Sequence, residues 1–247
     1  ERKEFTLAYQ PIVRLEDRSI AGFEALLRWE HPRRGPIPPS DFIPVAESCS
    51  LIVQLGLFAM QRAAEDLATW QKQIGDVSLF VSVNLSSRQL IRRDLVSDVR
   101  SIVARSSIRP RCFRLELTES LVMDNPEQSA HVLAKLKQLG IGLSLDDFGT
   151  GYSSLSYLTR FPFDTIKIDR SFVDDTSPKR AVLIKSMVNM AHELGLSVVV
   201  EGIADEGSAL ELRQMGCEYV QSYLFGAPVA ADQALRTLKD QYPLAQA

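Results

Sequence analysis

The chain has 247 residues, of which 45% are hydrophobic and 24% are charged, and its formal net charge is −3. This composition is typical of a globular domain with a sizeable core, and the slight excess of acid argues against binding to a nucleic acid polymer. No apolar run reaches the ~18 residues of a membrane span and no signal peptide is present, so we expect a cytoplasmic domain.

The cysteines and the first residue bear on the context of the chain. Cys49, Cys112 and Cys217 are widely spaced, which indicates reduced thiols in the core and no zinc site. The sequence starts at Glu1 without a methionine. We therefore expect a domain excised from a longer protein, which could itself be anchored to a membrane elsewhere.

Alternating apolar and polar residues predict two strands at the start of the chain, over residues 5–15 and 20–29, joined as a hairpin. A loop rich in proline and glycine follows over residues 32–39, and a helix is expected from about Ser40. From there strands and helices alternate. We expect strands over 79–85, 113–118, 141–146, 165–169, 197–201 and 219–221, and helices over 52–73, up to 106, 129–139, 179–194, 206–215 and 231–239.

This order of elements predicts the fold class. Strands that alternate with helices imply parallel βαβ units, and about eight strands in about 250 residues fit one α/β domain of the TIM (β/α)8 barrel type. The opening hairpin departs from that pattern because a hairpin pairs its strands antiparallel. No internal repeat, low-complexity segment or linker is present, so we predict a single domain over residues 1–247.

Polar side chains recur on one face of the predicted barrel strands. Val81 and Val83, for example, share a face of their strand, and Asn84 lies on the other. The apolar face should pack against the helices, so the polar face points into the barrel. The inward polar residues at or near successive strand ends are Asn84, Glu116, Asp146, Lys167, Glu201 and Gln221. Any one of them could simply meet solvent, but six at the catalytic face of a barrel favour a functional site.

The chemistry of this set favours a metal site. Closely spaced buried carboxylates do not all stay ionised without a counter-charge, and Glu, Asp and Asn oxygens without His or Cys suit Mg²⁺ or Mn²⁺. The stretch LSLDDFGTG adds Asp147, which we expect as the first loop residue, free to turn back beside the inward Asp146. Two adjacent carboxylates can bridge two metal ions ~3.5–4 Å apart. Gly149 and Gly151 let the loop fold tightly beside them.

Eight motifs in fixed order run over nearly the whole chain: YQPIV, GFEALLRWEHP, FIPVAE, VNLS, LELTES, DDFGTGYSSLSYL, IKIDRSFV and VEGI. By these motifs the chain resembles the EAL family of cyclic di-GMP phosphodiesterases, named for the tripeptide Glu24-Ala25-Leu26. The resemblance implies a modified TIM (β/α)8 barrel with an antiparallel first strand, in agreement with the hairpin. It also implies hydrolysis of cyclic di-GMP to linear pGpG by a water activated between two Mg²⁺ or Mn²⁺ ions, with Ca²⁺ expected to inhibit.

The resemblance also implies roles for residues that match the family's motifs. One metal ion would be held by Glu24, Asn84, Glu116 and Asp146, and the second would lie among Asp146, Asp147 and Glu201. Lys167 matches the residue that orients the attacking water, Gln221 a glutamine near that water, and Glu119 the glutamate that steadies the DDFGTG loop. Substrate contacts are matched by Gln10, Leu26, Arg28 and Asp169, with Arg28 directed at a phosphate.

Two positions differ from the family's usual pattern. Ala204 stands where a second glutamate is common, and Ser222 stands where glycine is common. Neither is an implied metal ligand, so we expect these differences to affect rate and regulation more than the reaction itself.

Two other functions compete with the phosphodiesterase. One is a catalytically weak receptor domain that binds cyclic di-GMP and signals by a change of shape; such receptors usually lose metal ligands that this chain retains. The other is a different metal-dependent barrel hydrolase, for which the ordered motifs would be coincidental. For the enzyme we expect cyclic di-GMP as partner together with flanking regulatory domains, and we leave homodimer formation open.

Overall fold

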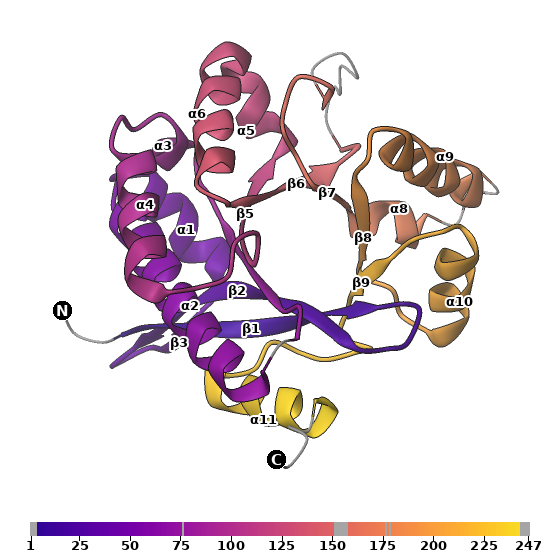
Figure 1. Cartoon of the computed structure of the whole chain (residues 1–247), viewed down its shortest axis with the longest axis horizontal. Coiled ribbons are helices and arrows are strands. Elements are labelled where there is room, and N and C mark those ends of the chain that lie inside the picture. The colour runs from indigo at the N-terminus through magenta and orange to yellow at the C-terminus, as the bar shows by residue number, and fades with distance from the viewer. Residues whose placement is uncertain (1–3, 76, 151–157, 176, 178, 243–247) are drawn as a thin grey trace.

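The computed structural model describes residues 4–75, 77–150, 158–175, 177 and 179–242. The described strands form one closed barrel with helices around it, as Figure 1 shows along the barrel axis. The strands are β1 (Phe5–Arg14), β2 (Ile20–His31), β3 (Gly35–Ile37), β4 (Phe80–Asn84), β5 (Phe113–Thr118), β6 (Gly142–Phe148), β7 (Thr165–Ile168), β8 (Ser197–Glu201) and β9 (Tyr219–Gln221).

The strand order confirms the predicted barrel with an antiparallel first strand. The order is β1-β9-β8-β7-β6-β5-β4-β2-β3, and the pairing of β1 with β2 closes the ring. The first strand is antiparallel to both of its neighbours, β2 and β9, whereas the pairs from β2–β4 through β8–β9 are parallel. The short β3 pairs with the outer end of β2 and lies outside the ring.

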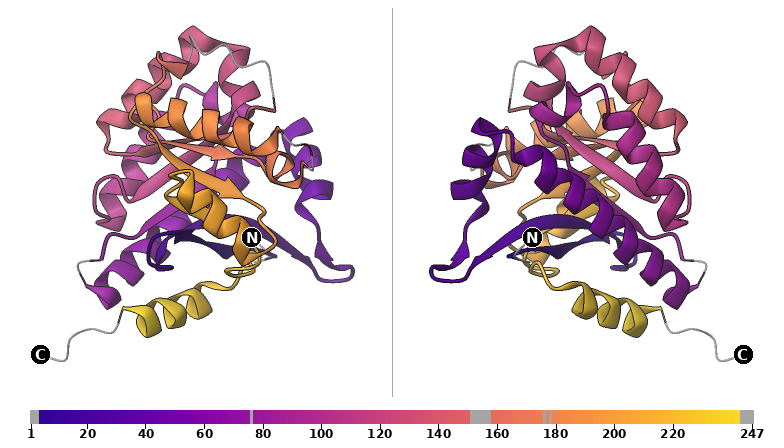
Figure 2. Two further views of the ribbon diagram at one scale, coloured as in Figure 1. Left: turned by 90° about the vertical axis from the view of Figure 1, so that its right-hand side faces the viewer. Right: turned by 90° about the vertical axis from the view of Figure 1, so that its left-hand side faces the viewer.

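The helices form the outer layer of the barrel (Figure 2). They are α1 (Pro39–Ser48), α2 (Ile52–Ile74), α3 (Ser87–Leu90), α4 (Leu95–Ser106), α5 (Glu119–Asp124), α6 (Pro126–Gln138), α8 (Arg170–Asp174), α9 (Arg180–Glu193), α10 (Glu206–Gln214) and α11 (Ala231–Gln241). Helix α11 lies beneath the β1–β2 hairpin in both views, and the adjoining Tyr242 hydroxyl donates a hydrogen bond to the carbonyl of Ile20. No described helix has the length and apolarity needed to cross a bilayer.

Local sequence explains several helix ends. Helix α6 starts three residues earlier than predicted because Pro126 occupies its first turn and the Asn125 side chain accepts a hydrogen bond from the Gln128 amide. Helix α2 ends at Gly75, whose φ of 73° is a conformation that glycine adopts without strain. The short α5 and α8 were not predicted, since neither spans two full turns and so neither shows a helical period.

The apolar residues divide as the strand parity predicts. Inward-facing Ile12, Ala21, Phe80 and Val199 form a small cluster with Tyr219, whereas the outward residues of the strands join a large cluster with the helices. In the parallel ladders, Phe80 pairs with Gly22 and Arg114 with Gly142. A side chain at either glycine would come within 2.6 Å of Phe80 or Arg114, so both glycines make room for large residues in the barrel floor.

Candidate active site

Lys167 lies at the centre of a carboxylate cluster at the carboxyl ends of the barrel strands. Its ammonium is 2.7 Å from Glu116 and from Glu201, 3.3 Å from Glu24 and 3.4 Å from Asp146. Parallel strand order brings these groups together, because β5, β6, β7 and β8 are consecutive neighbours and each carries its charged residue near the same edge. The structure therefore unites five residues that are widely separated in the sequence.

A hydrogen-bonded chain extends from this cluster to β1. The Gln221 amide donates to Glu24 at 2.6 Å and to Gln10 at 3.2 Å, and the Asn84 amide donates to the other oxygen of Glu24 at 2.6 Å. Gln221 thus connects a predicted substrate contact, Gln10, with a predicted metal ligand, Glu24. Ser222 follows Gln221, and its buried hydroxyl has no hydrogen-bond partner among the described residues.

The cluster holds more negative than positive charge, and the pKa values reflect this. Burial, opposed by Lys167 and reinforced by Glu24 and Asp146, raises the pKa of Glu116 to about 8. Burial likewise raises the pKa of Glu201 to about 6. At Glu24, attraction to Lys167 and hydrogen bonds outweigh burial and lower the pKa. The pKa of Lys167 is raised despite burial because Glu116 and its other carboxylate neighbours favour the ammonium form.

Asp147 occupies a different position in its strand from the one predicted. We expected the first loop residue, but β6 continues to Phe148. A bulge interrupts the pairing of β6 with β7, and the backbone of Asp147 has a φ of 54°. Because of this bulge and left-handed backbone conformation, the Asp147 side chain does not follow the inward–outward alternation of the strand. Burial, and then repulsion from Asp146 and Asp169, raise the pKa of Asp147.

Glu119 is buried at the start of α5 and contacts the segment that follows the two aspartates. Its carboxylate accepts a hydrogen bond of 3.3 Å from the backbone amide of Gly149, which has a φ of 92°. A side chain at Gly149 would come within 2.7 Å of the Phe172 ring, so glycine is required there on two grounds. Gly151 lies outside the described residues.

Asp169 lies apart from the ion-pair cluster around Lys167. It caps α8, where its side chain accepts a hydrogen bond of 2.9 Å from the Ser171 amide, and this lowers its pKa despite partial burial. Its negative charge still acts on Asp147, as the raised pKa of Asp147 indicates. An aspartate at this position is therefore explained equally well by capping of α8 and by a contact with substrate.

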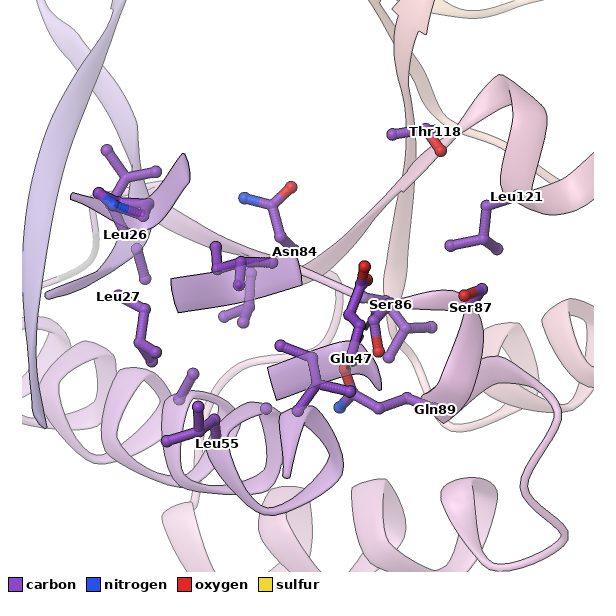
Figure 3. A pocket seen from close by; sticks show the side chains of 18 of the residues that line it. Leu26, Leu27, Glu47, Leu55, Asn84, Ser86, Ser87, Gln89, Thr118 and Leu121 are labelled. Carbon is purple, nitrogen blue, oxygen red and sulfur yellow. Dashed lines mark hydrogen bonds between the residues drawn. The ribbon is translucent and has the colours of Figure 1, made fainter. Parts of the chain in front are cut away.

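A pocket of about 520 Å³ opens beside the cluster, at the end of β2 and β4 (Figure 3). Leu26, Arg28 and Asn84 line it near the barrel, and α1, α2, α3 and α5 contribute to its other walls. The guanidinium of Arg28 donates only to the neighbouring carbonyl of Leu27, at 2.9 Å, and no described carboxylate pairs with it. Pairing with a nearby carboxylate, the other common role of an arginine, is therefore not what Arg28 does among the described residues.

The donor chemistry of the cluster fits a hard divalent cation. Glu24, Glu116 and Asp146 supply carboxylate oxygens and Asn84 an amide, which are the ligands that Mg²⁺ and Mn²⁺ prefer. Within the described part of the chain, no three acidic, histidine or cysteine side chains are already arranged as a metal cage. The Lys167 ammonium lies between these carboxylates and neutralises part of their charge.

Sequence reasoning from strand parity missed two members of this site. Glu24 and Gln10 were assigned only from the resemblance, although both lie in the predicted hairpin strands and face each other across β1 and β2. The signal was available: Glu24 is a buried acid in the otherwise apolar and glycine-containing stretch Ile20–Ala25. A carboxylate in such a setting requires a partner.

The chain is similar to one known protein family and to several named proteins. The EAL domain family matches residues 1–228. MucR of Pseudomonas aeruginosa, named a bifunctional diguanylate cyclase/cyclic di-GMP phosphodiesterase, is 39% identical over 240 residues, which are 96% of this chain and 35% of MucR. NbdA of the same organism, named a cyclic di-GMP phosphodiesterase, is 39% identical over 241 residues, which are 96% of this chain and 31% of NbdA. The chain therefore spans about a third of the length of these relatives.

A solved structure agrees with the sequence comparison. The phosphodiesterase of MucR in complex with cyclic di-GMP superposes with a TM-score of 0.90 at 39% identity, and the match covers 94% of this chain and 95% of that one. On the sequence match and the shared fold together, the chain belongs to the EAL domain family.

Proposed function

We propose that this domain hydrolyses one phosphodiester of cyclic di-GMP to linear pGpG in a reaction that depends on two Mg²⁺ or Mn²⁺ ions. The observation that carries the proposal is the cluster of four carboxylates around Lys167 at the carboxyl ends of the barrel strands. Its support comes from the relatives MucR and NbdA, both named as cyclic di-GMP phosphodiesterases, and from the cyclic di-GMP complex of MucR.

The metal ligands in this proposal are residues of the barrel edge. Glu24, Asn84, Glu116 and Asp146 would hold one ion, and Asp146, Asp147 and Glu201 would surround the second. When bound, the ions neutralise the phosphodiester and lower the pKa of the attacking water. The Lys167 ammonium, which lies among the same carboxylates, would share them with the ions.

The remaining residues orient the reactants. Lys167, which lies among the proposed metal ligands, would hold the attacking water by hydrogen bonding. Gln221 keeps the Glu24 carboxylate in place through its 2.6 Å hydrogen bond and fixes Gln10 beside it. Glu119 holds the Gly149 amide and so positions the turn that carries Asp147. Each of these residues acts through geometry, which is the main contribution of a protein to phosphoryl transfer.

The pocket beside the cluster is proposed to hold one nucleotide half of the substrate. Arg28 has a guanidinium without a carboxylate partner in the described chain, and its planar fork suits a phosphate. Leu26 and the apolar walls of the pocket suit the faces of a base. The pocket volume of about 520 Å³ falls in the range of small-molecule sites.

The direct test is a time course of cyclic di-GMP with the purified domain and Mg²⁺ or Mn²⁺, with separation of pGpG from the substrate. We expect stoichiometric pGpG. Tight binding without pGpG at any metal concentration, for monomer and dimer alike, would instead favour the receptor. Ser222→Gly and Ala204→Glu would then be the first variants to test. Regulatory segments beyond this domain and a homodimer remain predictions.

A further inference from the structure

We propose that Glu47 determines specificity for guanine by accepting hydrogen bonds from the N1–H and N2–H groups of one base of the substrate. This inference rests on the proposed function and adds to it a residue that reads the base. Glu47 lies in the last turn of α1 and lines the pocket beside the carboxylate cluster. Figure 3 shows its side chain directed into the space near Asn84 and Ser86.

The fold itself gives no reason for a carboxylate at this position. Among the described residues, no ion pair and no hydrogen bond engages the Glu47 carboxylate, although the side chain is half-buried. Glu47 also lies in the last turn of α1, where no basic residue is present and where the helix dipole disfavours a negative charge. A half-buried carboxylate without a protein partner among the described residues, at the helix end where negative charge is disfavoured, is available to a ligand in the pocket.

The other groups of the pocket limit what that ligand can be. The walls are mostly apolar, contributed by residues such as Leu27, Leu55 and Leu121, which suit the flat faces of an aromatic ring. Polar groups lie among them: beside Glu47, an acceptor, Ser86 and Ser87 carry hydroxyls, and Gln89 has a buried amide nitrogen without a partner among the described residues. The other polar lining residues are Arg28, Asn84, Thr118, Ser120 and Asp124. This combination fits a planar heterocycle that presents both donors and acceptors along its edge.

Guanine and adenine differ in the pattern that such a carboxylate meets. Guanine presents two adjacent donors, N1–H and N2–H, which a carboxylate can accept together, whereas adenine presents the N1 acceptor in the equivalent position. A carboxylate facing adenine N1 places two lone pairs against each other and leaves the charge unpaired. Glu47 is therefore expected to admit guanine and to oppose adenine, which is specificity by an unfavourable as well as a favourable contact.

Glu47 and Arg28 lie on the same pocket, which fits the two ends of one nucleotide. Arg28 lines the pocket where it meets β2, and Glu47 lines it from α1. A base held by Glu47 and a phosphate held by Arg28 belong to a single guanosine phosphate unit. The pocket has a second acid, Asp124, but that residue is exposed at the end of α5 and provides a matched control.

The test compares the native chain with Glu47→Gln and Asp124→Asn, using cyclic di-GMP and cyclic di-AMP as probes. Affinities are measured by calorimetry in EDTA, and KM and kcat for cyclic di-GMP are measured in Mg²⁺. We expect Glu47→Gln to weaken cyclic di-GMP by roughly 10- to 100-fold, the usual loss of a charged hydrogen bond. The effect should fall on KM with kcat nearly unchanged. Cyclic di-AMP should bind the Glu47→Gln variant as well as, or better than, the native chain, because the introduced side-chain amide can donate to adenine N1.

The outcomes separate the inference from the proposed function. Unaltered discrimination in Glu47→Gln, an equal loss for both ligands, or the same change in Asp124→Asn would each overturn the role of Glu47 while leaving the phosphodiesterase intact. If the native chain neither binds nor hydrolyses cyclic di-GMP, the proposed function fails and the inference fails with it. Thermal unfolding of both variants checks that a change in affinity does not follow from a change in stability.

Discussion

The ammonium of Lys167 lies 2.7 Å from the carboxylate of Glu116, and both side chains are almost completely excluded from solvent. The charges of the site do not cancel, because three further carboxylates surround the same ammonium. An excess of buried negative charge is unfavourable in an isolated domain and favourable for one that binds divalent cations. The relationship between these two residues leads to the predictions that follow.

Lys167→Met should destabilise the domain and make its stability depend on metal. Removal of one partner of a buried ion pair typically costs about 3–5 kcal/mol, and here it leaves several carboxylates without a cation. We expect the melting temperature to fall in EDTA and to recover in part with Mg²⁺, while turnover stays low. Lys137→Met, which removes the more exposed ion pair with Asp164, is the control and should show no such recovery. A melting temperature that is equally low with and without Mg²⁺ would contradict the prediction.

Stability without metal should decrease as the pH rises from about 5 to 8. The pKa of Glu116 is raised from 4.5 to about 8 and that of Glu201 to about 6, so the folded state binds more protons than the unfolded chain in this range. Folding stability then falls with increasing pH. We expect the melting temperature in EDTA to decrease over this interval, and Mg²⁺ to stabilise the domain more at pH 8 than at pH 6. Glu116→Gln should flatten the dependence; a profile that rises from pH 5 to 8 would exclude this account.

The metal requirement should follow the all-oxygen ligand set. Mg²⁺ and Mn²⁺ are expected to support turnover, and Ca²⁺ is expected to bind and inhibit, because its larger radius and loose geometry displace the water. Activity is measured after chelation and after stepwise return of each ion. Full activity in excess chelator would disprove the two-metal mechanism.

Glu119→Ala should lower turnover strongly while the barrel stays folded. The variant loses the acceptor for the Gly149 amide, and we expect the segment 147–153, part of which lies outside the described residues, to become disordered. Glu119→Gln retains an oxygen that can accept the Gly149 hydrogen bond, so it should recover much of the rate. If Glu119 acted only through its negative charge, Glu119→Gln would be as slow as Glu119→Ala. Kinetics and amide-exchange rates at Gly149 provide the two measurements. Unchanged kinetics in Glu119→Ala would reduce Glu119 to an ordinary strand-end residue.

Asp146→Asn should separate catalysis from binding. The substitution keeps the shape of a residue that would contact both metal ions and removes its charge, so turnover should fall by several orders of magnitude. Affinity for cyclic di-GMP should weaken far less, because Arg28, Leu26 and Gln10 are unchanged. pGpG formation and calorimetry on the same preparation measure both. An active Asp146→Asn variant would place the chemistry elsewhere.

Much of the barrel followed from the sequence, partly from pattern and partly from the family motifs. Alternation of side chains in β4, β5, β6 and β8 predicted which residues point inward, because in a regular strand the period of two leaves no other choice. The order of strands and helices predicted the parallel barrel, and the family resemblance, in agreement with the opening hairpin, implied its antiparallel first strand. Short or irregular segments were less predictable: β3 lies in the predicted loop, and the bulge at Asp147 breaks the parity on which the prediction relied.

The sequence by itself determined which side chains could form the site: the inward acids, Lys167 and Gln221 follow from local periodicity, and the family motifs add Glu24 and Gln10. Only the tertiary structure decided how they combine. Closure of β1 on β2 brings Glu24 within 3.3 Å of Lys167, although 143 residues separate them in the chain. It also decided that Glu47 faces a pocket without a partner among the described residues, because burial and pairing depend on contacts between α1, α2 and α3 that no local pattern encodes.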